Sequence, residues 1–76
     1  MAKTKKRDIE KGYPMPAFID KLRRLADALE SGKRFNISIA GERISVPVGA
    51  TYNIEHERAK DGEEIEFQIK WSKPKD

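Results

Sequence analysis

The apolar residues between Pro16 and Glu30 are spaced for one face of a helix. At 100° per residue, six of them fall within an arc of about 120°. They are Phe18, Ile19, Leu22, Leu25, Ala26 and Leu29. Proline suits the first turn of a helix, and Gly32 can take the left-handed conformation that often follows the last turn. The pattern therefore predicts an amphipathic helix over about residues 16–31.

From residue 34 onward the hydrophobic period changes from that of a helix to two, which is typical of half-buried strands. Four such segments cover about residues 34–40, 43–47, 52–60 and 63–71. Short polar or glycine-containing segments separate them, so we expect neighbouring strands to be antiparallel.

Two turns set the expected pairing of these strands. A two-residue turn at Gly41-Glu42 pairs Ile39 with Ile44, Ile37 with Val46, and Phe35 with Val48. A two-residue turn at Asp61-Gly62 is favoured by its residue types. It pairs Arg58 with Ile65, His56 with Phe67, Ile54 with Ile69, and Tyr52 with Trp71. In both registers, each inward-facing residue pairs with an inward-facing residue of the neighbouring strand.

These elements predict an α+β fold, in which the helix packs on one face of a four-stranded antiparallel meander. A sheet with one apolar face must cover it, and the helix is the available cover. Residues 8–13 permit an additional N-terminal strand, with Ile9 and Tyr13 on one face. We expect one domain over residues 7–72, a disordered basic tail at 1–6 and a short tail at 73–76.

The same residues resemble the amphi-Trp domain, a family of short bacterial and archaeal proteins. The matching features are Leu25-Ala26 with Leu29 and Gly32 at the helix end, Val46-Pro47 at a strand end, and the alternating Ile65, Phe67, Ile69 and Trp71. The resemblance spans about residues 8–72. One departure is Pro14-Met15-Pro16, which stands where a hydroxyl or acidic helix cap is expected. The resemblance implies the fold above, but no activity and no site residues.

Size and composition exclude several kinds of protein. The chain has 76 residues, no cysteine and one histidine, so a disulfide framework and a cysteine zinc site are excluded. We find no glycine-rich phosphate loop and no nucleophile–base set, and we therefore expect neither an enzyme nor a bound cofactor or metal. The lack of cysteine and of a long apolar segment favours a cytoplasmic protein.

The outward face of the second predicted hairpin is acidic. Glu57 is expected opposite Glu66, with Glu55 and Glu64 nearby. Like charges across a strand pair are destabilising, which suggests that this face has a use. It is either a solvated face that resists aggregation or a surface that binds a basic partner. Flat strand faces lack the encircling oxygens of a calcium or magnesium site.

The first half of the chain is basic. Residues 1–34 hold ten basic and five acidic side chains. The candidates for contact with nucleic acid are Lys3, Lys5, Lys6, Arg7, Lys21, Arg23, Arg24, Lys33 and Arg34. Such residues would bind phosphates without sequence preference and with strong salt dependence. Ordinary solubilising charge is the alternative, because acidic residues interrupt the helix face.

His56 and Trp71 are expected to be structural. His56 falls on the inward face without a nucleophile or carboxylate beside it, so we interpret it as a partly buried histidine. Trp71 ends an inward apolar row, where tryptophan anchors either a core or a partner.

Taken together, the sequence predicts a non-enzymatic interaction module. It would bind protein, or itself, through an exposed sheet face or edge strand. The alternative is a weak, non-specific nucleic-acid binder that uses the basic tail and helix.

Overall fold

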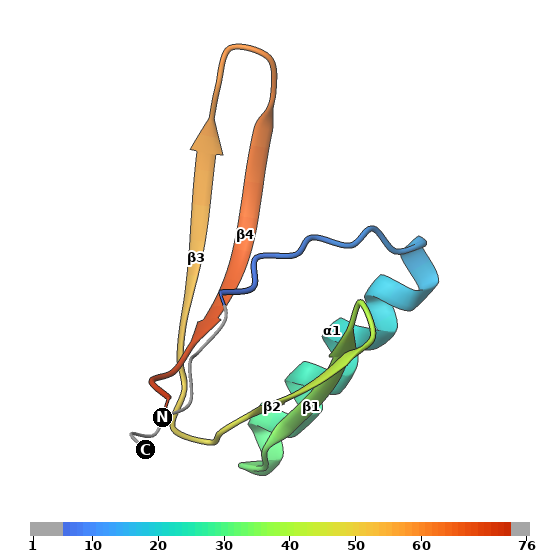
Figure 1. The fold of residues 1–76 in the computed structure, drawn as a ribbon, viewed down its shortest axis with the longest axis vertical. Coiled ribbons are helices and arrows are strands. Elements are labelled where there is room, and N and C mark those ends of the chain that lie inside the picture. Colours follow the sequence, from blue (N-terminus) through green and yellow to red (C-terminus); the bar gives the residue numbers. More distant parts are fainter. Residues whose placement is uncertain (1–5, 74–76) are drawn as a thin grey trace.

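The computed structural model describes residues 6–73 and has one helix followed by four antiparallel strands (Figure 1). The elements are α1 (Met15–Ser31), β1 (Phe35–Ile39), β2 (Glu42–Val46), β3 (Thr51–Arg58) and β4 (Glu63–Lys70). The predicted α+β class is confirmed. Each predicted element is present within about two residues of its expected bounds, because each has a distinct hydrophobic period.

Helix α1 begins and ends at the residues that its sequence favours. Pro14 precedes it in an extended conformation, without a side chain that caps the first turn. Gly32 follows it with φ of 65°, and its N–H donates to the carbonyl of Leu29 at 3.2 Å. The next N–H, from Lys33, donates to Ala28 at 3.0 Å. The left-handed glycine thus satisfies two carbonyls at the helix end.

The first hairpin has a different turn from the one predicted. Ala40 and Gly41 are its central residues, with φ of 48° and 85°. The tight turn needs positive φ at both positions, and glycine takes the second of them without strain. Phe35 therefore pairs with Val46, and Ile37 with Ile44. The predicted turn at Gly41-Glu42 was wrong, and so were its pairs, which are displaced by two residues.

The second hairpin is also displaced by two residues from its predicted register. Its loop is Ala59–Gly62, closed by a hydrogen bond from the Ala59 N–H to the Gly62 carbonyl at 2.9 Å. Because the shift is an even number, each side chain stays on its predicted face. The observed pairs are Tyr52 with Ile69, Ile54 with Phe67, His56 with Ile65, and Arg58 with Glu63. The two-residue turn at Asp61-Gly62 was wrong, since Gly62 does not take positive φ.

The two hairpins form separate two-stranded sheets. Strand β1 pairs with β2 and β3 pairs with β4, but β2 and β3 are not hydrogen-bonded neighbours. Figure 1 shows the long β3–β4 hairpin diverging from the first hairpin and the helix. Within residues 6–73, β1 is the strand against which α1 packs. The predicted single four-stranded meander under the helix is therefore not confirmed.

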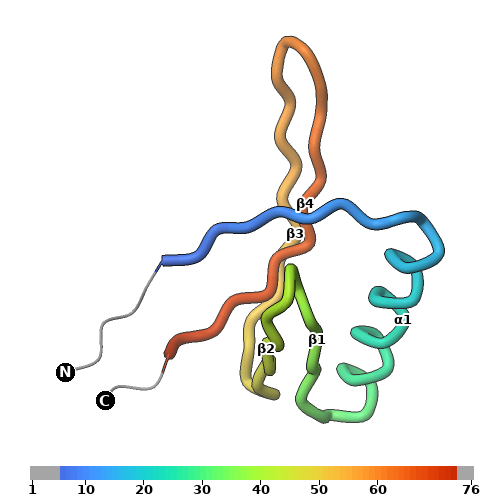
Figure 2. Tube along the Cα trace, turned by 45° about the vertical axis from the view of Figure 1, so that its right-hand side comes forward, coloured from blue at the N-terminus to red at the C-terminus, as the bar shows by residue number. Residues whose placement is uncertain are grey.

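The segment before the helix does not form the additional strand considered for residues 8–13. It runs as an extended chain past the second hairpin to the start of α1 (Figure 2). Arg7 attaches it to the first hairpin. Its Nη2 donates to the Ile39 carbonyl at 2.7 Å, and its Nη1 lies 3.3 Å from a Glu42 carboxylate oxygen. Residues 1–5 and 74–76, which hold most of the two predicted tails, lie outside the described part of the chain.

The core is small and lies in the first hairpin. Phe35 and Val46, which face each other across β1 and β2, are 7% and 4% exposed, and no other described side chain is as deeply buried. The Arg24 guanidinium of α1 lies 5.7 Å from the centre of the Phe35 ring and donates to the Asn36 carbonyl at 2.7 Å. Leu22 and Leu25, which were expected on the covered face of the helix, are only partly covered.

Candidate functional site

The inner face of hairpin β3–β4 exposes several large apolar side chains. We use this name for the side of the hairpin that carries Tyr52, Ile54, His56, Arg58, Glu63, Ile65, Phe67 and Ile69. Ile54, Ile65 and Phe67 are each 65% exposed. Scattered apolar residues are ordinary on protein surfaces, but a contiguous group on one strand pair indicates a surface for contact.

An open cleft of about 610 Å³ separates the inner face from the helix and the first hairpin. Its apolar lining includes Phe18, Leu22, Leu25, Phe35, Ile65 and Phe67. Apolar side chains of α1, β1 and β4 thus face one space without filling it. Alternation along the strands predicted which side chains share this face. It did not predict that the face would be open, because periodicity contains no information about what covers a sheet.

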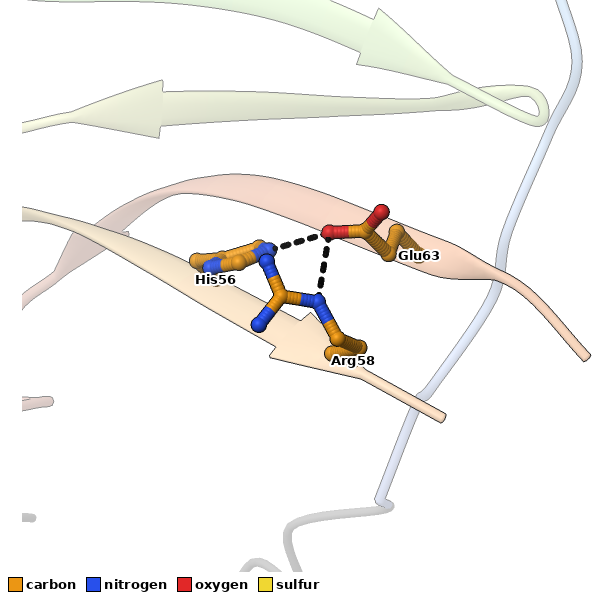
Figure 3. A network of polar contacts seen from close by, with 3 residues as sticks. All are labelled: His56, Arg58 and Glu63. Carbon is orange, nitrogen blue, oxygen red and sulfur yellow. Dashed lines mark hydrogen bonds and ion pairs between the residues drawn. The ribbon is translucent and has the colours of Figure 1, made fainter. Parts of the chain in front are cut away.

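The tip of the inner face is polar. Nε2 of His56 lies 2.9 Å from Oε2 of Glu63, and Nε of Arg58 donates to the same oxygen at 3.1 Å (Figure 3). All three side chains are exposed. The expectation of a partly buried histidine without a carboxylate neighbour was wrong, because the two-residue register shift places Glu63 opposite Arg58 and within reach of His56 on this face. The contacts join β3 to β4 near the loop.

The outer face of the same hairpin carries the predicted acidic residues. Glu55 lies opposite Glu66, and Glu57 lies opposite Glu64. The predicted pairing of Glu57 with Glu66 was wrong, and the observed register makes two like-charged pairs. The Glu66 carboxylate raises the pKa of Glu64 above its ordinary value, with further contributions from desolvation and from Glu57.

Three of these carboxylates come together. One oxygen from each of Glu57, Glu64 and Glu66 lies within 4.8 Å of the others. The neighbouring polar groups are already engaged, because Nδ2 of Asn53 donates to Gln68 at 2.6 Å and Gln68 donates to Glu66 at 3.4 Å. Three exposed acidic side chains on a flat strand pair provide few of the oxygens that calcium requires.

Several of the predicted basic contacts are used within the chain. Arg7 and Arg24 bind backbone carbonyls of the first hairpin, as described above. Nε of Arg34 donates to Oγ of Ser45 at 2.9 Å, and the Lys21 ammonium lies 4.8 Å from the centre of the Tyr13 ring. Of the other predicted cations, Lys6, Arg23 and Lys33 are exposed, and Lys3 and Lys5 lie outside the described residues.

Three cations nevertheless border one shallow hollow. Lys21 and Arg24 of α1 and Arg43 of β2 line a space of about 290 Å³, together with polar groups of β1. Arg43 was not among the sequence candidates. It lies on the strand after the basic region, and only the packing of α1 against the first hairpin brings it near the helix cations.

Trp71 lies immediately after β4 and remains partly exposed. It borders an open hollow with Ile9 and Ile44 and does not pair with Tyr52 as predicted. The expected role as a buried core anchor is therefore not met in this structure, and the alternative of a partner contact stays open.

Comparison with known proteins found no relative of this chain. No family model, no curated protein and no solved structure matches the chain. Among residues 6–73, no helix is long and apolar enough to cross a membrane.

Proposed function

We propose that this chain is a non-enzymatic interaction module that binds protein through the inner face of hairpin β3–β4. The observation that carries the proposal is the exposure of Ile54, Ile65 and Phe67, 65% each, on one side of a two-stranded sheet. An isolated hairpin is marginal in water, and an apolar face gains stability when a partner removes it from solvent. The free backbone edges of β3 and β4 supply further contacts for an added strand.

The chemistry of the inner face supports binding over catalysis. Its titratable groups are at the tip, where His56, Arg58 and Glu63 contact one another in solvent. An active site requires such groups beside a water-excluding cavity. The apolar residues lie closer to the base of the hairpin and offer contact area without reactive groups. We expect them to act as anchors and the polar tip to act as a rim.

We also propose that the four-stranded meander predicted by the sequence forms only when the inner face is bound. In this bound form the edge of β2 pairs with an edge of β3, and α1 covers the four strands. The apolar rows of α1, β1 and β4 already border one cleft, which supports this arrangement. The apolar alternation supports the further proposal that the chain belongs to the amphi-Trp family, and the lack of cysteine supports a cytoplasmic location.

Site-specific photocrosslinking in the cells that produce the protein tests the binding face. A photoreactive phenylalanine analogue replaces Phe67 on the inner face or, as the matched control, Glu55 on the outer face. We expect covalent adducts with protein from position 67 and few or none from position 55. Adducts from position 55 alone, or from neither position, would refute the proposal.

A second candidate function is weak binding of nucleic acid, which the hollow bordered by Lys21, Arg24 and Arg43 favours. Phosphate contacts at this hollow would fall steeply with salt. Titration of isotope-labelled protein with short duplex DNA and single-stranded RNA at 50 and 200 mM salt separates this function from protein binding. Resonance shifts near the hollow that vanish at high salt would support it, and unchanged spectra at low salt would exclude it.

A further inference from the structure

The chain of 76 residues exposes far more surface than a compact protein of its mass. Its accessible surface is 7107 Å², whereas a compact monomer of 8.7 kDa exposes about 4,700 Å². The excess accessible surface is about 2,400 Å². Half of this excess is more than the ~800 Å² of surface that each partner buries in a stable dimer. The radius of gyration is 14.5 Å, against about 11 Å expected for a compact chain of this length. The chain thus has the surface that a stable interface requires.

The exposed surface is complementary to another part of the same chain. The inner face presents exposed apolar residues, and α1 and β1 present apolar residues to the open cleft, which the segment before α1 also borders. Among residues 6–73, β2 and β3 each have one edge that pairs with no other strand. A hairpin placed beside β2 would continue the first sheet and lie beneath the helix. This one contact would cover the apolar surfaces and also pair the free strand edges.

The segment between the hairpins directs β3 away from its own β2. It has four residues, Pro47 to Ala50, and the Ala50 N–H donates to the Pro47 carbonyl at 3.3 Å. This turn leads into a diverging hairpin, which Figure 1 shows extended away from the first hairpin. Short hinge segments of this kind favour exchange of an element between two chains over closure within one chain.

We propose that a second copy of this chain fills the cleft, so that two copies exchange their β3–β4 hairpins. The hairpin of each copy pairs with β2 of the other and places Ile54, Ile65 and Phe67 beneath the other copy's helix. The interface is isologous, with identical contacts on both sides of a twofold axis. The inference rests on the proposed function, because it identifies the protein that the inner face binds.

Sedimentation and small-angle scattering of the purified full chain test the inference. We expect a dimer whose dissociation constant rises about 30-fold or more in Phe67→Asp, since the substitution places an unpaired charge in an apolar interface. The matched control, Glu55→Gln on the outer face, should stay within about threefold, as rim substitutions do. A dimer that Phe67→Asp does not weaken would overturn the inference.

Cysteine crosslinking distinguishes exchange from other dimers, because the natural chain has no cysteine. One chain carries Leu22→Cys and a second chain of different mass carries Phe67→Cys. Exchange predicts a disulfide between the two chains on mild oxidation, and its absence from the mixed dimer would overturn the inference.

The monomer outcomes separate the inference from the proposed function. A monomer with a radius of gyration near 14.5 Å would overturn self-exchange but leave the inner face open to a different protein. A monomer near 11 Å would overturn both, because the chain would then cover its own inner face.

Discussion

Replacement of Val46 by alanine tests whether the small core of the first hairpin stabilises the protein. Val46 is 4% exposed and lies opposite Phe35, whereas Val48, two residues later, is 58% exposed. The pair Val46→Ala and Val48→Ala removes the same atoms from two environments. Only the first should leave a cavity, because the second side chain has few atoms around it.

The magnitude follows from the buried atoms. Two methyl groups contribute about 0.8 kcal/mol each by transfer from water, or about 1.6 kcal/mol together. The cavity beside Phe35 adds about 1 kcal/mol, so Val46→Ala should lower the free energy of unfolding by about 2–3 kcal/mol. Val48→Ala should change it by about 0.5 kcal/mol or less. The first loss is large beside the few kcal/mol that stabilise a chain of this size.

Urea denaturation followed by far-ultraviolet circular dichroism measures both changes. The protein concentration must be equal in all samples, because self-association would stabilise the folded state by mass action. With a slope of about 1 kcal/mol per molar urea, the midpoint of Val46→Ala should fall by about 2 M or more, or the variant should be unfolded without urea. Equal midpoints for the two variants would refute the assignment of the core to Phe35 and Val46.

Two further substitutions test the acidic face and the helix end. Glu66 raises the folded-state pKa of Glu64, so the penalty of its ionisation appears as pH rises above the ordinary glutamate range. Glu64→Gln should therefore raise the melting temperature at pH 7 but not at pH 3.5, and an equal change at both would contradict this cause. Gly32→Ala should lower the unfolding free energy by about 1–2 kcal/mol, since φ is 65° there. The control Gly49→Ala should leave the urea midpoint nearly unchanged, because Gly49 does not take positive φ. Equal losses of unfolding free energy at the two glycines would contradict backbone strain as the cause.

Local pattern was enough to predict the elements and the faces of the strands. The helical spacing from Phe18 to Leu29 and the alternation from Phe35 onward are local properties, and α1 and the four strands follow them. The inner and outer faces of hairpin β3–β4 were also predicted, although the pairs were not. An even register shift leaves every face unchanged, so alternation cannot distinguish the two registers.

The conformations of the two turns set the strand registers, and the residue types alone did not indicate which conformation each turn adopts. Ala40 takes a positive φ that its side chain disfavours, which the sequence did not indicate. The four-residue loop at Ala59–Gly62 replaced the predicted two-residue turn. The contact between His56 and Glu63 depends entirely on that loop, and for this reason the sequence missed it.

The sequence by itself determined which side chains are apolar on each element and, through their period, which kind of element each segment forms. Only the tertiary structure decided that the two hairpins lie apart, that Phe35 and Val46 form the core, and that Ile65 and Phe67 face an open cleft. The physical reason is that periodicity is a property of neighbours along the chain. The cover over an apolar face comes from contacts between distant segments or from another chain, and the path of Pro47 to Ala50 between β2 and β3 sets which segments meet.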